Sequence, residues 1–262
     1  MNEIIQLIID KKELQNINRD IVKRLINENL DKKIEKIISE KRFKTSIFRN
    51  FVKKIRAQLR RQYGAFQNPK IDRKELLKKK DYIALLKSHQ SSKERLPYYE
   101  KIYEHFWKIT GVPETILDLG CGMNPISFEF MKLKQLEYHA YDISKYDLGI
   151  IKSYFDNKKI KCVTKVFDAT TDKYVFDKNF DVCFCFKLFE ILETTKSHKL
   201  SEDIFLKIPC DFLIASFNTR TLGNKPMKRA RRIWFEVMLE RLGFKFNTLI
   251  IPNEIFYIIN KQ

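Results

Sequence analysis

The residues that could carry chemistry start with a glycine-containing run, ILDLGCG at residues 116–122. An apolar stretch that is typical of a strand ends at Gly120 and Gly122, and Asn124-Pro125 then opens a helix. Glycines at the carboxyl end of a strand let the backbone approach a ligand closely, and ligands of open α/β sheets bind at that edge. A dinucleotide loop would need a further glycine where Pro125 stands. The run therefore favours S-adenosylmethionine over a ligand that carries a pyrophosphate.

Two carboxylates follow the next apolar runs, at places where that cofactor needs hydrogen-bond acceptors. Asp142 comes directly after the run 138–141, where it could accept from both ribose hydroxyls. Asp168 follows the run 162–167 and could accept from the adenine amino group. Each acid alone would more often cap a helix. Their joint position after successive strands predicts a cofactor site, with Asp118 in a supporting role.

The remaining titratable residues suggest no catalytic dyad and no metal site. The five cysteines lack CxxC or disulfide-framework spacing, which favours a reducing compartment. Cys183 and Cys185 alternate on a predicted buried strand, where core packing is the better interpretation. The apolar N-terminal run is short and flanked by acids, and no run of membrane-spanning length occurs. We therefore expect a cytoplasmic protein that contacts no membrane.

The pattern of apolar residues changes near residue 110. Residues 1–110 carry apolar residues at helical spacing, with helices expected at 45–63 and 71–88. The first of these has a stripe of Ile47, Phe51, Ile55 and Leu59. From residue 111 onward, short apolar runs (115–119, 138–141, 162–167, 182–186 and 212–217) alternate with helical stretches, which is typical of a parallel sheet covered on both faces. Two further strands are expected at 244–250 and 255–259. We expect an all-α N-terminal domain (1–110) and an α/β domain (111–262) with a seven-stranded, Rossmann-like class I methyltransferase sheet whose last strand is reversed.

Positive charge is concentrated in one window. The 51 basic and 33 acidic residues give a net charge of +18. Residues 41–80 alone hold 15 Lys and Arg against 2 Asp and Glu, and a second basic cluster spans 225–232. Two separated basic patches predict contact with a large folded RNA rather than with a short oligonucleotide. We expect no DNA partner. The residues expected to bind RNA are Lys53, Lys54, Arg56, Arg60, Arg61, Lys78, Lys79, Lys228, Arg229 and Arg232.

Several separate motifs over residues 80–262 give a family resemblance. They are HQSSKER (89–95), ILDLGCGMNP (116–125), YHAYD (138–142), Ser216-Phe217 with TRTLG (219–223), and WFE (234–236). Together they resemble the aminoglycoside-resistance 16S rRNA methyltransferases of the Arm/Rmt/Sgm type, which modify N7 of a guanosine in the decoding site. The resemblance implies that Arg95 binds the methionine carboxylate of the cofactor. It also implies that the helical extension grips the 30S ribosomal subunit.

The target site is specified less closely than the cofactor site. Asn218 stands where the family usually has Pro, and Phe189-Glu190 and Pro226-Met227-Lys228 replace Leu-Pro and Gly-Met-Glu. Guanine N7 loses no proton on methylation, so the reaction needs alignment rather than a general base. We expect Lys187, Ser216 and Arg220 to organise that site in a monomeric enzyme. Two alternatives are methylation of another RNA atom (N1 of an rRNA adenine, or a tRNA) and a non-catalytic RNA-binding or assembly protein.

Overall fold

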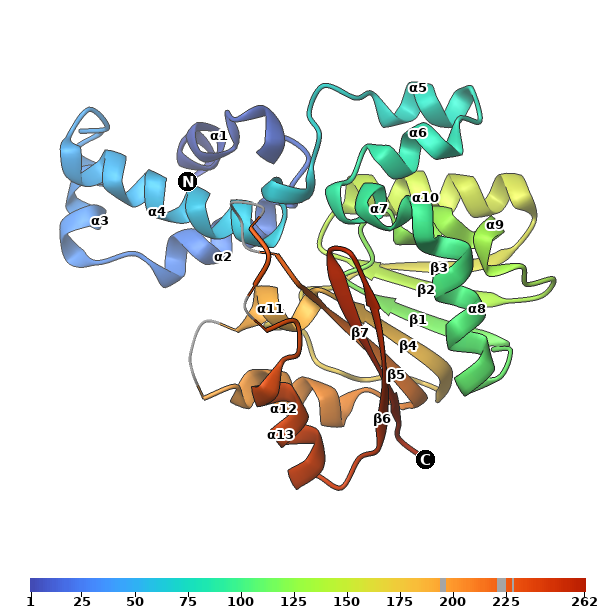
Figure 1. The fold of residues 1–262 in the computed structure, drawn as a ribbon. Helices are drawn as coiled ribbons and strands as arrows, with labels where there is room; N and C mark the ends of the chain where they lie inside the picture. Colours follow the sequence, from blue (N-terminus) through green and yellow to red (C-terminus); the bar gives the residue numbers. More distant parts are fainter. Residues whose placement is uncertain (194–196, 221–224, 228) are drawn as a thin grey trace.

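Four N-terminal helices pack into a small core of their own. The computed structural model describes residues 1–193, 197–220, 225–227 and 229–262. Asn18, Asp31 and Thr45 each cap the helix that follows with a side-chain oxygen, which fixes where these helices begin. We call residues 1–63 the helical cluster (Figure 1). Its helices are α1 (Asn2–Ile9), α2 (Arg19–Glu28), α3 (Lys32–Ser39) and α4 (Ser46–Gln62).

The predicted helix at 45–63 is confirmed, but its inward face differs by one position. Ile47 is 37% exposed, whereas Phe48 is buried beside Phe51 and Ile55. The predicted helix at 71–88 is wrong in one respect, because it is two helices, α5 (Arg73–Lys78) and α6 (Tyr82–Lys87). The break has a local cause: Lys80 has a φ of 55°, and the Asp81 side chain accepts a hydrogen bond from the amide of Ala84.

The apolar cores divide earlier along the chain than the change of periodicity near residue 110. Leu85 and Leu86 of α6 and Ile102 and Phe106 of α8 (Tyr99–Thr110) are fully buried against the sheet rather than in the helical cluster. The periodicity reports where helices give way to strands. It does not show against which core each helix packs. The buried residues of the helical cluster end at Tyr63.

The seven-stranded sheet has the order β3-β2-β1-β4-β5-β7-β6, with β7 antiparallel to both of its neighbours. This confirms the predicted class I methyltransferase sheet and its reversed last strand. Strand β1 has the predicted bounds, and the other six lie within two residues of theirs at either end. The strands are β1 (Thr115–Leu119), β2 (Glu137–Asp142), β3 (Lys161–Val166), β4 (Phe180–Phe186), β5 (Cys210–Asn218), β6 (Phe246–Ile251) and β7 (Glu254–Asn260).

Helices cover both faces of the sheet, as Figure 1 shows. One face packs against α8, α9 (Phe128–Met131) and α10 (Lys145–Lys158). The other packs against α11 (Leu188–Leu192), α12 (Lys199–Lys207) and α13 (Ile233–Arg241), and Cys183 and Cys185 are buried in this second core. Among the described residues, no helix combines the length and the apolar character that crossing a membrane requires.

Candidate active site

A pocket lies at the carboxyl ends of β1, β2 and β4, between the sheet and the helical cluster. It holds about 840 Å³ of empty space, its open mouth included. The end of α4 and the turn that follows it form one wall, which Figure 1 shows beside the sheet. The lining residues used below are Gln62, Tyr63, His89, Arg95, Gly120, Gly122, Asp142, Ile143, Asp168, Lys187, Leu188 and Leu192.

The glycine turn after β1 depends on both of its glycines. Gly120 and Gly122 have φ angles of 67° and 49°, which a residue with a Cβ atom rarely adopts. A Cβ on Gly122 would lie 2.8 Å from ring atoms of His89, and one on Gly120 would lie 3.0 Å from Leu188. Burial, followed by the nearby Arg73 and Arg95, holds the pKa of His89 well below its usual range. A neutral imidazole therefore packs directly against the turn.

Asp142 is fixed by backbone amides and still faces the pocket. Its Oδ2 accepts from the amide of Gly122 at 2.9 Å, and its Oδ1 accepts from the amide of Ser144 at 2.9 Å. Burial and the neighbouring Asp147 raise the pKa of Asp142 to about 6. A carboxylate has about four acceptor positions, so two remain here for hydroxyl donors in the pocket.

Asp118 does not line the pocket. It is buried behind the turn, where it accepts from Asn124 Nδ2 at 3.0 Å and from the hydroxyl of Tyr138 at 2.7 Å. Burial raises the pKa of Asp118 to about 6. Its supporting role is therefore to hold the start of the helix that follows the turn, not to touch a ligand.

Arg95 lines the pocket and is held by a residue that sequence reasoning missed, Glu254. Arg95 Nε donates to Glu254 Oε2 at 2.9 Å and Nη2 donates to Oε1 at 2.8 Å. Although burial alone would lower the pKa of Arg95, Glu254 raises it. Glu254 is the first residue of β7 and is fully buried. The sequence signal that could have indicated Glu254 is a single charge directly before the apolar run 255–259.

The three residues expected to organise the target site lie in different places. Lys187 lines the pocket, and its Nζ lies 2.7 Å from Glu94 and 3.7 Å from Glu254. Ser216 is fully buried below the pocket, where its hydroxyl donates to Glu254. Arg220 forms an antiparallel backbone β-bridge with Pro226 beyond the end of β5 and does not line the pocket. Residues 221–223 of the TRTLG motif lie outside the described residues.

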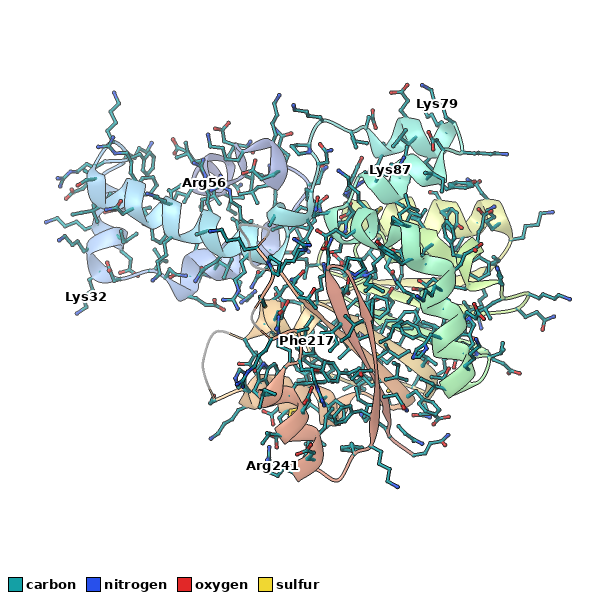
Figure 2. The ribbon with its side chains drawn as sticks, in the orientation of Figure 1. Lys32, Arg56, Lys79, Lys87, Phe217 and Arg241 are labelled. Carbon is teal, nitrogen blue, oxygen red and sulfur yellow. The ribbon has the colours of Figure 1, made fainter. Side chains whose placement is uncertain are left out.

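The residues expected to bind RNA form two groups. Lys53, Lys54, Lys78, Lys79 and Arg229 are exposed, and Lys79 pairs with Glu75 at 2.6 Å. Figure 2 shows Lys79 projecting beside the end of α5. Lys228 lies outside the described residues.

The second group consists of four arginines with partners inside the protein. Arg56 donates to backbone carbonyls of α1, Arg60 pairs with Glu13, Arg61 donates to the carbonyl of Glu190, and Arg232 pairs with the carboxylate of Glu190. The carboxylates of Glu13 and Glu190 therefore offset the charges of Arg60 and Arg232, so fewer charges are free than the sequence suggests.

Comparisons with known proteins agree with this geometry. The FmrO model, described as "Ribosomal RNA methyltransferase", matches residues 50–258. A Frankia casuarinae protein named 16S rRNA (guanine(1405)-N(7))-methyltransferase is 29% identical over 180 residues, which cover 67% of this chain and 62% of that protein. A Proteus mirabilis protein of the same name is 25% identical over 241 residues, which cover 80% and 83%.

The fold is shared with solved structures. The structure of the 16S rRNA methyltransferase RmtF in complex with S-adenosyl-L-homocysteine has a TM-score of 0.78 at 19% identity, with coverage of 100% of this chain and 98% of that one. The chain spans less than two thirds of the length of the Frankia casuarinae and Micromonospora echinospora relatives. The family model nevertheless matches well over half of the chain, so this protein belongs to the FmrO family of ribosomal RNA methyltransferases.

Proposed function

We propose that this chain is an S-adenosylmethionine-dependent methyltransferase that modifies 16S rRNA in the 30S subunit at N7 of a guanine in the decoding site. The observation that carries the proposal is the pocket at the strand ends, with its two-glycine turn and the amide-anchored Asp142. Family membership supports the substrate class. We further propose that the protein acts as a monomer in the cytoplasm and that the methyl group confers aminoglycoside resistance.

The residues of the pocket fit this cofactor. Asp142 keeps free acceptor positions for ribose hydroxyls, and Asp168 for an adenine amino group. A guanidinium has more N–H groups than Glu254 engages, so Arg95 can still donate to the methionine carboxylate. Gly122 has no Cβ, so the backbone can approach the ligand there.

The chemistry of the pocket suits a transfer that removes no proton from the base. When bound, the cofactor supplies a methyl group on a sulfonium, and N7 of guanine attacks with its own lone pair. The side chains then have to hold both partners in line, which is a large part of the catalysis of such reactions. Lys187 is placed for this role, since its ammonium is fixed between Glu94 and Glu254 at the edge of the pocket.

The exposed lysines support docking on structured RNA. Lys53 and Lys54 lie on α4, and the same helix ends in the wall of the pocket at Gln62. A basic helix face that attracts phosphates therefore lies on the element that flanks the pocket. We infer that this face fixes the orientation of the enzyme on the subunit.

Mapping of methylated nucleotides on purified 30S subunits tests the proposal. After incubation with enzyme and S-adenosylmethionine, borohydride and aniline cleavage should appear at one decoding-site guanosine. A primer-extension stop without cleavage would instead indicate N1-methyladenosine. The Asp142→Ala variant should lose activity and cofactor binding, whereas Asp156→Ala, which removes an exposed acid of α10, should keep both.

Equilibrium binding separates an enzyme from a non-catalytic assembly protein. The wild type should bind S-adenosyl-L-homocysteine in isothermal titration calorimetry, and Asp142→Ala should weaken this binding strongly. Absence of binding by the wild type, or equal binding by Asp142→Ala, would refute the methyltransferase proposal.

A further inference from the structure

One arginine of the helical cluster contacts a carboxylate that lines the cofactor pocket. Arg24 lies on α2, and its Nη2 donates to Asp168 Oδ2 at 2.7 Å across 144 residues of sequence. The two side chains are only 25% and 14% exposed, so water screens this pair less than it screens a surface ion pair. Arg24 also lies outside residues 50–258, which the family model matches.

The contact fixes a carboxylate that otherwise has only local partners. Asp168 Oδ1 accepts from the amide and the hydroxyl of Thr170, and Oδ2 accepts from Arg24. With about four acceptor positions on a carboxylate, one remains for a donor in the pocket. The arginine thereby sets the direction in which that free position points.

Three further contacts hold the helical cluster against the same pocket. Ile143, the neighbour of Asp142, packs into the core of the helical cluster. The hydroxyl of Tyr63 lies 3.4 Å from Ser144 Oγ, and Arg61 Nη2 donates to the carbonyl of Glu190 at 3.0 Å. These contacts hold the helical cluster, and with it α2, beside Asp168 independently of Arg24. Removing the guanidinium of Arg24 should therefore leave α2 in place.

We propose that Arg24 is a positioning residue for the adenine end of the cofactor, which it holds in register through Asp168. This inference rests on the proposed function, because it assigns Asp168 to the adenine amino group. It makes the helical cluster part of the cofactor site as well as part of the RNA-docking surface. Cofactor affinity then depends on a residue that belongs to a different core.

The test is calorimetric titration of full-length variants with S-adenosyl-L-homocysteine. Arg24→Met should weaken binding by about fivefold, the equivalent of one hydrogen bond. Arg24→Lys should recover part of the loss. Two controls are matched to the contact: Arg19→Met removes an arginine of the same helix, and Glu28→Gln removes the other partner of Arg24. Both should bind within about twofold of the wild type.

A second ligand separates positioning from general loosening. S-inosyl-L-homocysteine has a carbonyl oxygen where adenine has its amino group, so it cannot donate to Asp168. Arg24→Met should leave its affinity within about twofold of the wild-type value. Unchanged affinity of Arg24→Met for S-adenosyl-L-homocysteine, or equal weakening for both ligands, would overturn this inference alone. A wild type that binds neither ligand would overturn the proposed function.

Discussion

Replacing Glu254 by glutamine should destabilise the protein far more than an ordinary loss of surface charge. Glu254 is fully buried and faces Arg95, whose side chain is 3% exposed, and Lys187, whose side chain is 4% exposed. Removing one partner of a buried ion pair costs roughly 3 kcal/mol, because the remaining charge stays desolvated. For a chain of this size, that corresponds to a fall in the melting temperature of about 6–12 °C.

Thermal unfolding followed by circular dichroism measures this effect. The matched control is Glu104→Gln, which removes an exposed glutamate paired with Lys108 and should leave the melting temperature almost unchanged. The double variant Arg95→Met/Glu254→Leu should recover part of the loss, since it removes the charges of Arg95 and Glu254 together while Lys187 keeps Glu94 as its partner. Equal melting temperatures for Glu254→Gln and Glu104→Gln would refute the reasoning, as would a double variant no more stable than Glu254→Gln.

Four further outcomes are expected. Gly122→Ala should weaken S-adenosyl-L-homocysteine binding at least about tenfold. The control is Gly243→Ala: Gly243 also has a positive φ but has open space around it, so this variant should lose some stability and keep its affinity. Equal affinities of the two variants would contradict the steric argument. Cofactor affinity should fall as the pH falls through about 6, because protonated Asp142 offers fewer acceptors, and Asp142→Asn should flatten a titration series between pH 5 and 8. The pH dependence of folding has the opposite sign. Because the pKa of Asp142 is higher in the folded state than in the unfolded state, its contribution to stability is present below the unfolded-state pKa and is lost as the pH rises through 6. Denaturant midpoints measured between the two pKa values can check this. Finally, Lys53→Glu/Lys54→Glu should weaken 30S binding and reduce the slope of log affinity against log salt, with cofactor affinity unchanged; an unaltered slope would exclude this face from docking.

The fold could be predicted from the sequence because its signals are local. Strand β1 was expected at 115–119 and has those bounds, since an apolar run that ends in glycines is a property of adjacent residues. The two glycines after β1, which prove to have positive φ angles, and the acid after β2 were predicted from the same kind of local signal. The break between α5 and α6 also had a local signal, Asp81 before Tyr82, which the long lysine-rich pattern obscured.

The pairing of charges could not be predicted, because it depends on contacts between distant segments. Arg232 was assigned to RNA on its position in a basic cluster, yet Glu190, 42 residues earlier, engages its guanidinium. Glu254 and Arg24 act through partners 159 and 144 residues away. No spacing rule connects such positions, so the sequence predicts the residues of the cofactor turn better than those that support the pocket.

Residues of the pocket are held by partners from far earlier and far later in the chain, and this has a consequence for the order of synthesis. Arg24 is made before the lining residues of the pocket, and Glu254 is made after them. Until β7 pairs with β5, Arg95 and Lys187 lack the carboxylate that lies between them. The charge pairing of the site is therefore completed only after β7 has been made, and a growing chain that lacks β7 holds Arg95 without its carboxylate partner.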